Sequence, residues 1–576
     1  MVNAEMILQE AYPNFKLGKR RTLTLKVFRN LLHESDFNEV IERNRHLRGF
    51  AFLDKLLEYC GFSYHLSPKS YNNIPHEGRL IIVANHPIGT LDGLALVKLI
   101  RSIRPDVRIV ANRLLLHIEP LRSVFLPVDV MSSEKKLLKQ SYKVMVDALN
   151  NEEAIIIFPA GEVSRATPKG IRDGKWKPGF LKLAKKTKSP ILPIHIKASN
   201  SSLFYLSSLV YKPAASLLLV KEMFNKRSQE LKFKVGSPIP HHAFATLDEP
   251  AGVLAQRFRK HVLNLEKKRG GERFFETVET VAHPVDRKAL KMALYETSLL
   301  GETADGKKIF LYQHKDDCPI MQEIARLREL TFRSVEEGTG NALDWDQYDR
   351  YYSHLVLWDE NDLEIVGAYR IGNGAEIIKS KGIEGFYTST LFDFSAQFER
   401  CLPNSIELGR SFVQPRYWGR RSLDYLWYGI GAYLRDRPTI KYLFGPVSLS
   451  NGYPQEAKEV IVSFYKQQFS AKSALVRARN PFVIPKEAEQ FAQTAFSSDY
   501  RDSYKVLNSE LKRLGVKVPA LYKQYAELCL EGGCQFIGFN VDHQFNDCID
   551  SLVMVSLDKI VEKKRRRYIE QKRVVI

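Results

Sequence analysis

The chain has 576 residues, of which 44% are hydrophobic and 26% charged, a balance typical of a soluble globular protein rather than a disordered or collagen-like one. Lysine and arginine number 86 against 66 aspartates and glutamates, and this net charge of +20 predicts acidic partners such as nucleic acid, anionic lipid or an acidic carrier protein. The 6 cysteines form no CxxC pair, which argues against a disulfide scaffold and a zinc ribbon.

In the first half of the chain, short apolar runs alternate with helical patterns. Residues 1–74 predict a helical N-terminal region. Buried strands are expected at 80–84, 107–111, 154–158 and 190–196, and helices at 91–100 and 133–150. Strands that alternate with helices are typical of an α/β layer architecture. We therefore predict an α/β domain over residues 75–270.

A second set of elements follows the lysine- and glycine-rich stretch 267–271. Residues 271–292 are expected to form a linker and residues 293–576 a second α/β domain. Strands are expected at 308–313, 405–413 and 441–447, a hairpin at 354–358 and 364–371, and helices at 320–332 and 422–435. The predicted fold class is therefore α/β in two domains.

The most informative motif of the first half joins a histidine to an aspartate. The predicted strand 80–84 leads into Asn85 and His86, and Asp92 follows at the start of the next helix. A neutral imidazole can take a proton from a hydroxyl, while a carboxylate on its other nitrogen fixes the tautomer and stabilises the imidazolium. His86 and Asp92 are therefore candidates for a catalytic base and its orienting partner, with the substrate's own hydroxyl as nucleophile.

A second motif follows the predicted strand 154–158 and reads FPAGEVSR over residues 158–165. Its glycine turn, with a glutamate and an arginine nearby, suits a phosphate, a carboxylate or a carbonyl dipole. The candidate substrate-binding residues of this half are Asn85, Gly161, Glu162, Ser164 and Arg165.

Together these motifs resemble the lysophospholipid acyltransferases of the 1-acylglycerol-3-phosphate acyltransferase type. That family carries Asn-His-x4-Asp, then Phe-Pro-Glu-Gly-Thr/Ser, then an apolar-Pro-Val/Ile strand, which LPI at residues 192–194 matches. The resemblance covers about residues 75–240. It implies a glycerolipid-acyltransferase-like αβ fold in which His86 is the general base, Asp92 orients it, and the second motif binds the polar head of the acceptor.

The chain departs from this family pattern in two places. Five residues rather than four separate His86 from Asp92, and Gly89 can absorb the extra one. Ala160 stands where the family usually has its glutamate, and Glu162 comes two places later. We therefore expect an acceptor other than an ordinary lysophosphatidate.

In the second half, the candidate site residues are charged and aromatic residues in or beside the predicted elements. They are Arg328, Phe332, Asp346, Asp349, Arg370, Glu407 and Arg410. Arg328 and Phe332 lie one helical turn apart and so share a face. Glu407 and Arg410 differ by an odd number of residues, which places them on opposite faces of a straight strand unless Gly409 marks a bulge.

The order and spacing of these residues resemble two families with an N-acetyltransferase-like αβ fold. These are the acyl-homoserine-lactone autoinducer synthases and the ornithine N-acyltransferases, often labelled "hemolysin". The residues around Arg370 and Glu407 resemble those of the second family more closely. The resemblance runs over about residues 300–470. It implies that Glu407 binds or deprotonates an amine, that Arg370 and Arg410 bind a carboxylate or orient a loop, and that Asp346 and Asp349 face the cationic side of the acceptor.

The two resemblances in one chain match the bifunctional ornithine lipid synthases. This implies that the second domain transfers a 3-hydroxyacyl group from acyl carrier protein to ornithine, and that the first domain then acylates the hydroxyl of that lyso-lipid from acyl carrier protein. The expected substrates are a free amino acid and the lyso-aminolipid. No metal or redox cofactor is expected, because the acyl carrier protein thioesters are already activated co-substrates.

Three alternatives remain open. The same chemistry can use glycine or another amino acid. The first domain can instead make phosphatidic acid while the second is regulatory, although an intact Glu407-x2-Arg410 strand argues against an inactive domain. A membrane-lytic or nucleic-acid-binding protein is disfavoured, because no secretory signal opens the chain and the basic tail 563–573 lacks interleaved aromatic motifs.

The expected location is cytoplasmic and peripheral on the inner membrane. No apolar stretch is long enough to span a bilayer. The basic cluster 16–21, the basic tail 563–573 and the uncharged stretch 198–211 are candidates for electrostatic attachment and shallow insertion into an anionic surface.

Overall fold

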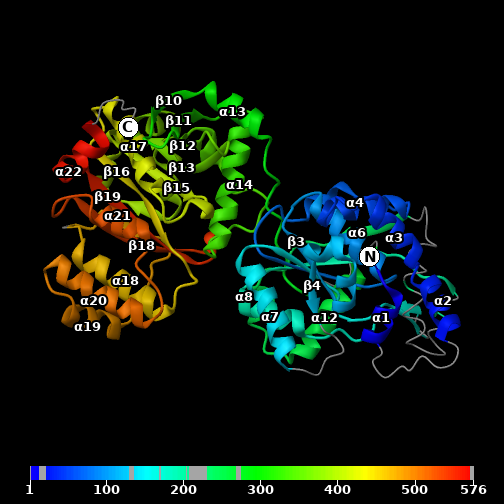
Figure 1. Ribbon diagram of the computed structural model, residues 1–576. Coiled ribbons are helices and arrows are strands. Elements are labelled where there is room, and N and C mark those ends of the chain that lie inside the picture. Colours follow the sequence, from blue (N-terminus) through cyan, green and yellow to red (C-terminus); the bar gives the residue numbers. More distant parts are fainter. Residues whose placement is uncertain are drawn as a thin grey trace. The chain divides into compact units, whose positions relative to one another are not determined.

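The computed structural model describes residues 2–11, 21–128, 135–167, 170–202, 204–205, 219, 230–267, 274–471 and 473–570. The chain forms two compact units, Met1–His283 and Pro284–Ile576, which Figure 1 colours blue to green and green to red. Several stretches discussed above lie wholly or partly outside the described residues, namely 16–21, 133–150, 198–211, 267–271, 271–292 and 563–573. Among the described helices, none is long and apolar enough to cross a membrane.

The first unit is built on a mixed sheet with the order β1-β9-β8-β2-β5-β3-β4. Its strands are β1 (Ser63–Leu66), β2 (Leu80–Ala84), β3 (Val107–Asn112), β4 (Phe125–Val128), β5 (Ala154–Ile157), β8 (Ile191–Lys197) and β9 (Glu230–Val235), with a separate hairpin of β6 (Arg165–Thr167) and β7 (Gly170–Arg172). Its helices are α1 (Ala4–Ala11), α2 (Arg21–Leu31), α3 (Glu34–Arg43), α4 (Gly49–Tyr59), α5 (Pro68–Asn72), α6 (Thr90–Arg101), α7 (Lys135–Asn150), α8 (Gly179–Thr187), α11 (His242–Ala245) and α12 (Ala251–Asn264).

Helices cover both faces of this sheet, which explains why its central strands are apolar throughout. Successive side chains of a strand point to opposite faces. In β2, Ile82 packs in the same cluster as α4 and α6, whereas Ile81 and Val83 pack in the cluster of α7, α8 and α12. Strands β2 and β5 are parallel neighbours, so the loops after them meet at one edge of the sheet, as in other α/β proteins that bind ligands there.

The second unit is built on a sheet with the order β10-β11-β12-β13-β15-β16-β19-β18. Its strands are β10 (Ser298–Glu302), β11 (Lys308–Gln313), β12 (Ser353–Asp359), β13 (Glu364–Asn373), β15 (Ser405–Val413), β16 (Tyr442–Leu449), β18 (Cys534–Asp542) and β19 (Cys548–Ser556), with a separate pair of β14 (Phe392–Phe394) and β17 (Val476–Ala478). Its helices are α13 (Arg287–Tyr295), α14 (Pro319–Ser334), α15 (Gly374–Lys381), α16 (Ala396–Glu399), α17 (Ser422–Arg435), α18 (Gln455–Gln468), α19 (Lys486–Ala495), α20 (Tyr500–Arg513), α21 (Ala520–Ala526) and α22 (Glu562–Arg565).

The decisive feature of this sheet is the short pairing of β15 with β16. The two strands are parallel and pair only over Ser405–Glu407 and Tyr442–Phe444. Beyond that point they part, and residues from the later halves of both strands line a cavity of about 620 Å³. The parting begins at Gly445, where an added Cβ would lie 1.9 Å from the carbonyl oxygen of Leu408.

A bulge in β15 lies at the same place. The register shifts so that Gly409 pairs with Arg370 while Phe412 pairs with Ala368, which leaves an extra residue on β15. Arg410 takes a left-handed backbone with φ of 46°, a conformation that is uncommon for non-glycine residues. The bulge that Gly409 suggested is therefore confirmed.

The fold class and the strands and helices expected from the sequence are confirmed to within a few residues at their ends, but two regional expectations need correction. Residues 1–74 are not wholly helical, because β1 joins the sheet beside β9. The expected linker 271–292 is not a free connection in its described part. Thr280 hydrogen-bonds to Asn73 in the first unit, and Arg287 opens α13 in the second.

A pair of glycine substitutions tests whether close approach at Gly445 fixes the parting of the strands. We expect Gly445→Ala to lower the thermal unfolding midpoint, since overpacking of a well-packed site typically costs about 1–3 kcal/mol. Gly409→Ala is the matched control, because an added Cβ there meets nothing within 4 Å. Equal unfolding midpoints for the two variants, measured by calorimetry on the full chain, would contradict this reading.

Candidate functional site

The first candidate site lies where the loops after β2 and β5 meet. His86 Nδ1 lies 3.1 Å from Asp92 Oδ2, and the same oxygen accepts hydrogen bonds from the backbone N–H groups of Ile88 and Gly89 at 2.8 and 3.0 Å. Asp92 is fully buried in the first turn of α6, where a carboxylate is favoured by the helix dipole. When Nδ1 donates to Asp92, Nε2 is left as the acceptor, which is the arrangement that a general base needs.

The imidazole is held on its other sides as well. The His86 ring stacks on Phe158 with centroids 4.0 Å apart and planes 18° apart, and its side chain keeps 18% of its surface exposed. Phe158 opens the FPAGEVSR motif, so the two sequence motifs are in direct contact. A base that is oriented but still accessible can reach a substrate hydroxyl.

A buried aspartate that the sequence analysis missed ties the two motifs together. Asp173 Oδ1 accepts hydrogen bonds from the His86 backbone N–H at 3.1 Å and from Ser164 Oγ at 2.5 Å, while its Oδ2 accepts from Trp176 Nε1 at 3.0 Å. The Ser164 N–H also donates to the His86 carbonyl at 2.7 Å. Asp173 follows the motif in an irregular loop with no periodic pattern, so only the fold reveals its role.

The other candidates of this half differ in what they contact. The Asn85 side chain is buried and exchanges two hydrogen bonds with the backbone of Ile196, so it joins β2 to β8 rather than facing a substrate. Gly161 and Glu162 are exposed on a turn, and Gly161 has a φ of 69°. Arg165 stacks its guanidinium over Phe204, and its Nε and Nη1 are buried without a hydrogen-bond partner among the described residues.

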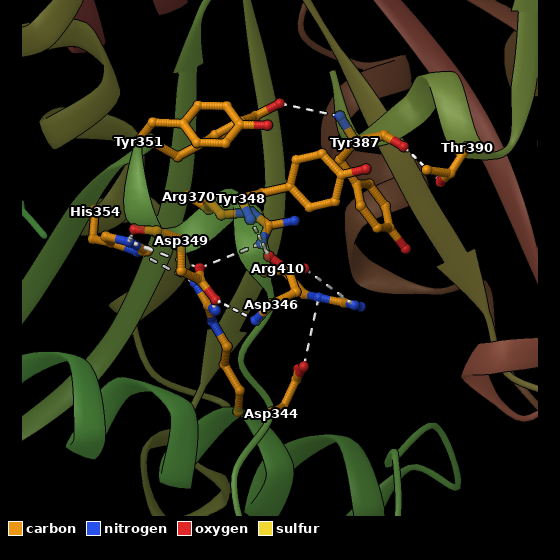
Figure 2. Close-up of polar contacts among 12 residues, drawn as sticks. Asp344, Asp346, Tyr348, Asp349, Tyr351, His354, Arg370, Tyr387, Thr390 and Arg410 are labelled. Atoms are coloured by element: carbon orange, nitrogen blue, oxygen red, sulfur yellow. Dashed lines mark hydrogen bonds and ion pairs between the residues drawn. The ribbon is translucent and has the colours of Figure 1, made fainter. Parts of the chain in front are cut away.

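The second candidate site centres on a buried cluster of charges, shown in Figure 2. Asp349 is fully buried, and its Oδ1 accepts hydrogen bonds from Arg328 at 2.8 Å and Arg370 at 3.3 Å. Arg370 also donates to Asp346 at 2.7 Å. Burial alone would raise the pKa of Asp349, but Arg328 and Arg370 outweigh it and hold that pKa well below its usual range.

These charges form ion pairs with one another, although Arg328 Nε, Arg370 Nε and Nη2 and Asp346 Oδ2 have no hydrogen-bond partner among the described residues. Arg328, Arg370 and Asp349 are all at least 99% buried, and none of them lines the cavity beside β15. His354, also buried, lies next to Asp349, and burial lowers its pKa to about 4. The ion pairs suit residues that fix the loop and strand around the site, and the expectation that Arg370, Asp346 and Asp349 bind the acceptor stays a prediction.

Glu407 likewise holds a loop in place. Its carboxylate accepts hydrogen bonds from the hydroxyl of Tyr352 and from the backbone N–H groups of Tyr387 and Thr388, the latter two at 3.1 and 2.8 Å. Glu407 is 1% exposed and is not part of the cavity lining, whereas Tyr387 is. Burial raises the pKa of Glu407, against the opposing effect of its hydrogen bonds. Its position suits a residue that fixes Tyr387 better than one that deprotonates an amine.

Arg410 and Phe332 are the sequence-predicted residues of this half that reach the cavity. The Arg410 guanidinium lies between the rings of Tyr387 and Phe545, 5.1 and 4.8 Å from their centroids. Its Nε lies 3.8 Å from Asp344, too far for a hydrogen bond (Figure 2). Arg410 is therefore a cation surrounded by two aromatic rings and by the carboxylates of Asp344 and Asp346, and its Nε has no hydrogen-bond partner among the described residues.

The cavity also contains two carboxyl groups that the sequence analysis did not single out. Glu337 follows α14 and accepts a hydrogen bond from Ser448 Oγ at 2.9 Å. Asp550 is the cross-strand partner of Ser448 on β19. Both line the cavity and are more than 90% buried. From the sequence, two adjacent glutamates after a helix are both expected to be exposed to solvent. Only the fold shows that Glu337 is buried while Glu336 is exposed.

Comparisons with known proteins find one acyltransferase-type domain in each half of the chain. A family described as "Acyltransferase" matches residues 7–261, and one described as "Acetyltransferase (GNAT) domain" matches residues 327–428. The glycine N(alpha)-acyltransferase of Bacteroides thetaiotaomicron is 33% identical over 51% of this chain and 90% of its own length. The chain belongs to the N(alpha)-acyltransferase family. With the first match, it is a fusion of two acyltransferase-type domains.

Two further relatives are similar to parts of this fused acyltransferase. The lyso-glycine lipid O-acyltransferase of Phocaeicola vulgatus is 27% identical over 44% of this chain and 90% of its own length. The L-ornithine N(alpha)-acyltransferase of Rhodobacter capsulatus is 27% identical over 44% of this chain and 92% of its own length. The expectation of an acyltransferase built from two fused domains is thus confirmed.

The buried charge cluster of the fused acyltransferase predicts a large stability loss for Asp349→Asn. The substitution leaves Arg328 and Arg370 buried without their shared carboxylate, and breaking a buried ion pair typically costs about 3–5 kcal/mol. Because the folded-state pKa is depressed, the stabilisation is present above the unfolded pKa of about 4 and is lost as pH falls further.

The measurement is thermal unfolding of the second unit's transition in the full chain, from pH 7 downward. Asp316→Asn is the control, because that side chain is fully exposed. An Asp349→Asn midpoint equal to that of the control at pH 7 would show that the cluster does not support the fold.

Proposed function

We propose that this protein is a bifunctional acyltransferase that makes an amino-acid-containing membrane lipid. Its second unit joins an acyl group to the α-amine of a free amino acid, and its first unit acylates the hydroxyl of the resulting lyso-lipid. The observation that carries the proposal is the presence, in one chain, of an oriented and partly exposed His86 and a separate cavity between parted strands.

The cavity of the second unit suits an acyl thioester. Apolar and aromatic side chains such as Phe412, Val413 and Leu426 line much of it. Helix α17 begins at the cavity wall, and Arg420 in the lining precedes its first turn. A helix N-terminus beside an arginine favours an anion, so this wall suits the phosphate of a phosphopantetheine arm.

The first unit suits acyl transfer to a hydroxyl. His86 takes the proton of the hydroxyl as its oxygen attacks the thioester carbonyl, and Asp92 stabilises the imidazolium that forms. Arg165, whose Nε and Nη1 have no hydrogen-bond partner among the described residues, is the group that we assign to the carboxylate of the lyso-lipid. This acceptor carries a carboxylate where a lysophosphatidate carries a phosphate, which fits the departure from the family motif at Ala160.

The amine acylation comes first. The hydroxyl that the first unit acylates is carried by the 3-hydroxyacyl chain, so it reaches that site only after the second unit has acted. This order also separates the two units experimentally, because loss of either one leaves a different product.

Glycine is the amino acid that we favour as the acceptor. The glycine N(alpha)-acyltransferase relative is 33% identical over 51% of the chain, whereas the ornithine N(alpha)-acyltransferase relative is 27% identical over 44%. An O-acyltransferase relative also carries a lyso-glycine lipid in its name. Ornithine, the acceptor that the sequence resemblance implies, remains the second candidate because its enzymes are also relatives.

Acyl carrier protein is the donor that we propose for both steps, and an anionic membrane surface is the proposed place of work. Both partners are acidic, and a net charge of +20 raises the rate of encounter with them. The described part of the basic tail contributes less than its sequence suggests, because Arg567 pairs with Asp424 of α17. A protein that stays in solution when mixed with anionic vesicles at low salt would contradict this placement.

Isotope labelling in a host that lacks aminolipids tests the proposed acceptor. Cells that express the full chain are fed ¹³C-labelled glycine or ¹³C-labelled ornithine, and total lipid is measured by mass spectrometry. We expect a new diacylated lipid whose head-group fragment carries the glycine label. A label from ornithine alone would identify the second candidate, and the absence of any new aminolipid would refute the proposal.

Two variants test the order of the two steps. His86→Ala should stop only the O-acylation, because loss of a general base typically costs about 10²–10⁴-fold, so the monoacylated lyso-lipid should accumulate. Arg410→Ala should remove the lyso-lipid and the diacylated lipid together. Lyso-lipid supplied to purified Arg410→Ala protein should still become diacylated.

The same lipid extracts give the contradicting results. Normal diacylated lipid from the His86→Ala protein would show that this histidine is not the base. Failure of a folded Arg410→Ala protein to use supplied lyso-lipid would show that the two units share one composite site.

A further inference from the structure

Several polar side chains of the cavity lie close together in one small region. Glu337 accepts a hydrogen bond from Ser448, and Ser448 faces Asp550 across the β16–β19 ladder. The positive charge of Arg410 acts on both carboxyl groups from β15. These groups therefore lie together, although they come from four separate segments of the chain.

A second observation, a buried hydroxyl that has no partner, points to a ligand in this cavity. Thr331 of α14 also lines the cavity and is 6% exposed, and its hydroxyl has no hydrogen-bond partner among the described residues. A buried hydroxyl that has lost its water partners and gained no others is unfavourable. A small polar molecule in the cavity would supply the missing partner to Thr331 and to Arg410 Nε.

On the basis of the proposed function, we propose that Glu337 is the catalytic base of the amine acylation and that Glu337, Asp550, Thr331 and Arg410 form the binding site of the amino-acid acceptor. A free amino acid carries one ammonium and one carboxylate. The carboxyl groups of Glu337 and Asp550 suit the ammonium, the Thr331 hydroxyl can accept from it, and the Arg410 guanidinium suits the carboxylate.

The proposed amine acylation moves two protons and exchanges one C–S bond for one C–N bond. The ammonium of the amino acid gives one proton to the Glu337 carboxylate, and the neutral amine attacks the thioester carbonyl carbon. The C–N bond forms, the C–S bond breaks, and the second proton of the attacking nitrogen goes to the departing thiolate. Glu337 then releases its proton to solvent, so the products are the N-acyl amino acid, the free thiol of the donor and one proton.

The ionisation of Glu337 fits this task. Burial raises the pKa of Glu337 to about 7, while the Ser448 hydrogen bond and the Arg410 charge oppose the rise. A base with a pKa near the working pH is the most effective compromise between availability and strength. The titratable and charged groups that act on it from the surrounding elements are Arg410, Tyr453, Tyr522, Cys548 and Asp550.

A comparison of two acceptors separates a base from a residue that only supports the fold. The purified full chain is assayed with a 3-hydroxyacyl carrier protein and either the amino acid that the wild-type protein uses or aminooxyacetate. The aminooxy group is already neutral at pH 7 and needs no base. We expect Glu337→Gln to lower kcat with the amino acid about 10²–10⁴-fold and to lower it far less with aminooxyacetate.

The control is Glu336→Gln, which changes the adjacent exposed carboxylate and should leave both rates unchanged. Equal losses with both acceptors in a Glu337→Gln protein that unfolds at the wild-type temperature would overturn the inference, and so would no loss. A wild-type protein that acylates neither glycine, ornithine nor any other amino acid would instead overturn the proposed function.

Ser448→Ala keeps the inference testable if Glu337→Gln does not fold. Removal of the hydroxyl takes a hydrogen bond from the ionised carboxylate, so the pKa of Glu337 should rise. The acid limb of the kcat profile should then move to higher pH, since the carboxylate is the active form. An unchanged limb would overturn the assignment of Glu337 as the base.

Discussion

The second unit depends on one constraint, the early parting of two parallel strands. β15 and β16 pair for three residues and then diverge at Gly445, opposite the bulge at Arg410. Two parallel strands that stayed paired would fill this space with their own side chains and hydrogen bonds. Because they part, side chains from both strands, from α14 and from β19 face one cavity. The buried ion pairs around Asp349 hold the surrounding loop and strand while the cavity stays open.

In the first unit, a single carboxylate holds the loops of the site together. Asp173 binds the backbone of His86 and the hydroxyl of Ser164, so the loops after β2 and β5 are held against each other. Asp92 then has only to orient the imidazole, which it does from the start of α6. In both units a buried acid fixes the backbone near the reacting group. The groups that we assign to chemistry are different residues, His86 and Glu337.

The sequence predicted the fold well where periodicity is strong and the site well where residues are close in sequence. The apolar run of β2 and the amphipathic pattern of α7 marked elements that the structure confirms. Likewise, His86 and Asp92 come together because only a short turn separates them. The loop that Glu407 holds could not be predicted, because it comes from the distant residues 387–388. Glu337 and Asp550 were missed for the same reason, since they lie 213 positions apart in the chain and only the sheet brings them together.

The central claim is that two separate sites act in order on one lipid, and trans-complementation tests it most directly. The purified His86→Ala and Arg410→Ala chains are mixed with the amino acid and with two thioesters of acyl carrier protein. One thioester carries a 3-hydroxyacyl group and the other carries an acyl group. Each chain alone should make no diacylated lipid from the free amino acid. Together they should make it, because the lyso-lipid that one chain releases is the substrate of the other. A mixture that makes lyso-lipid but no diacylated lipid, although the Arg410→Ala chain is folded, would contradict the account.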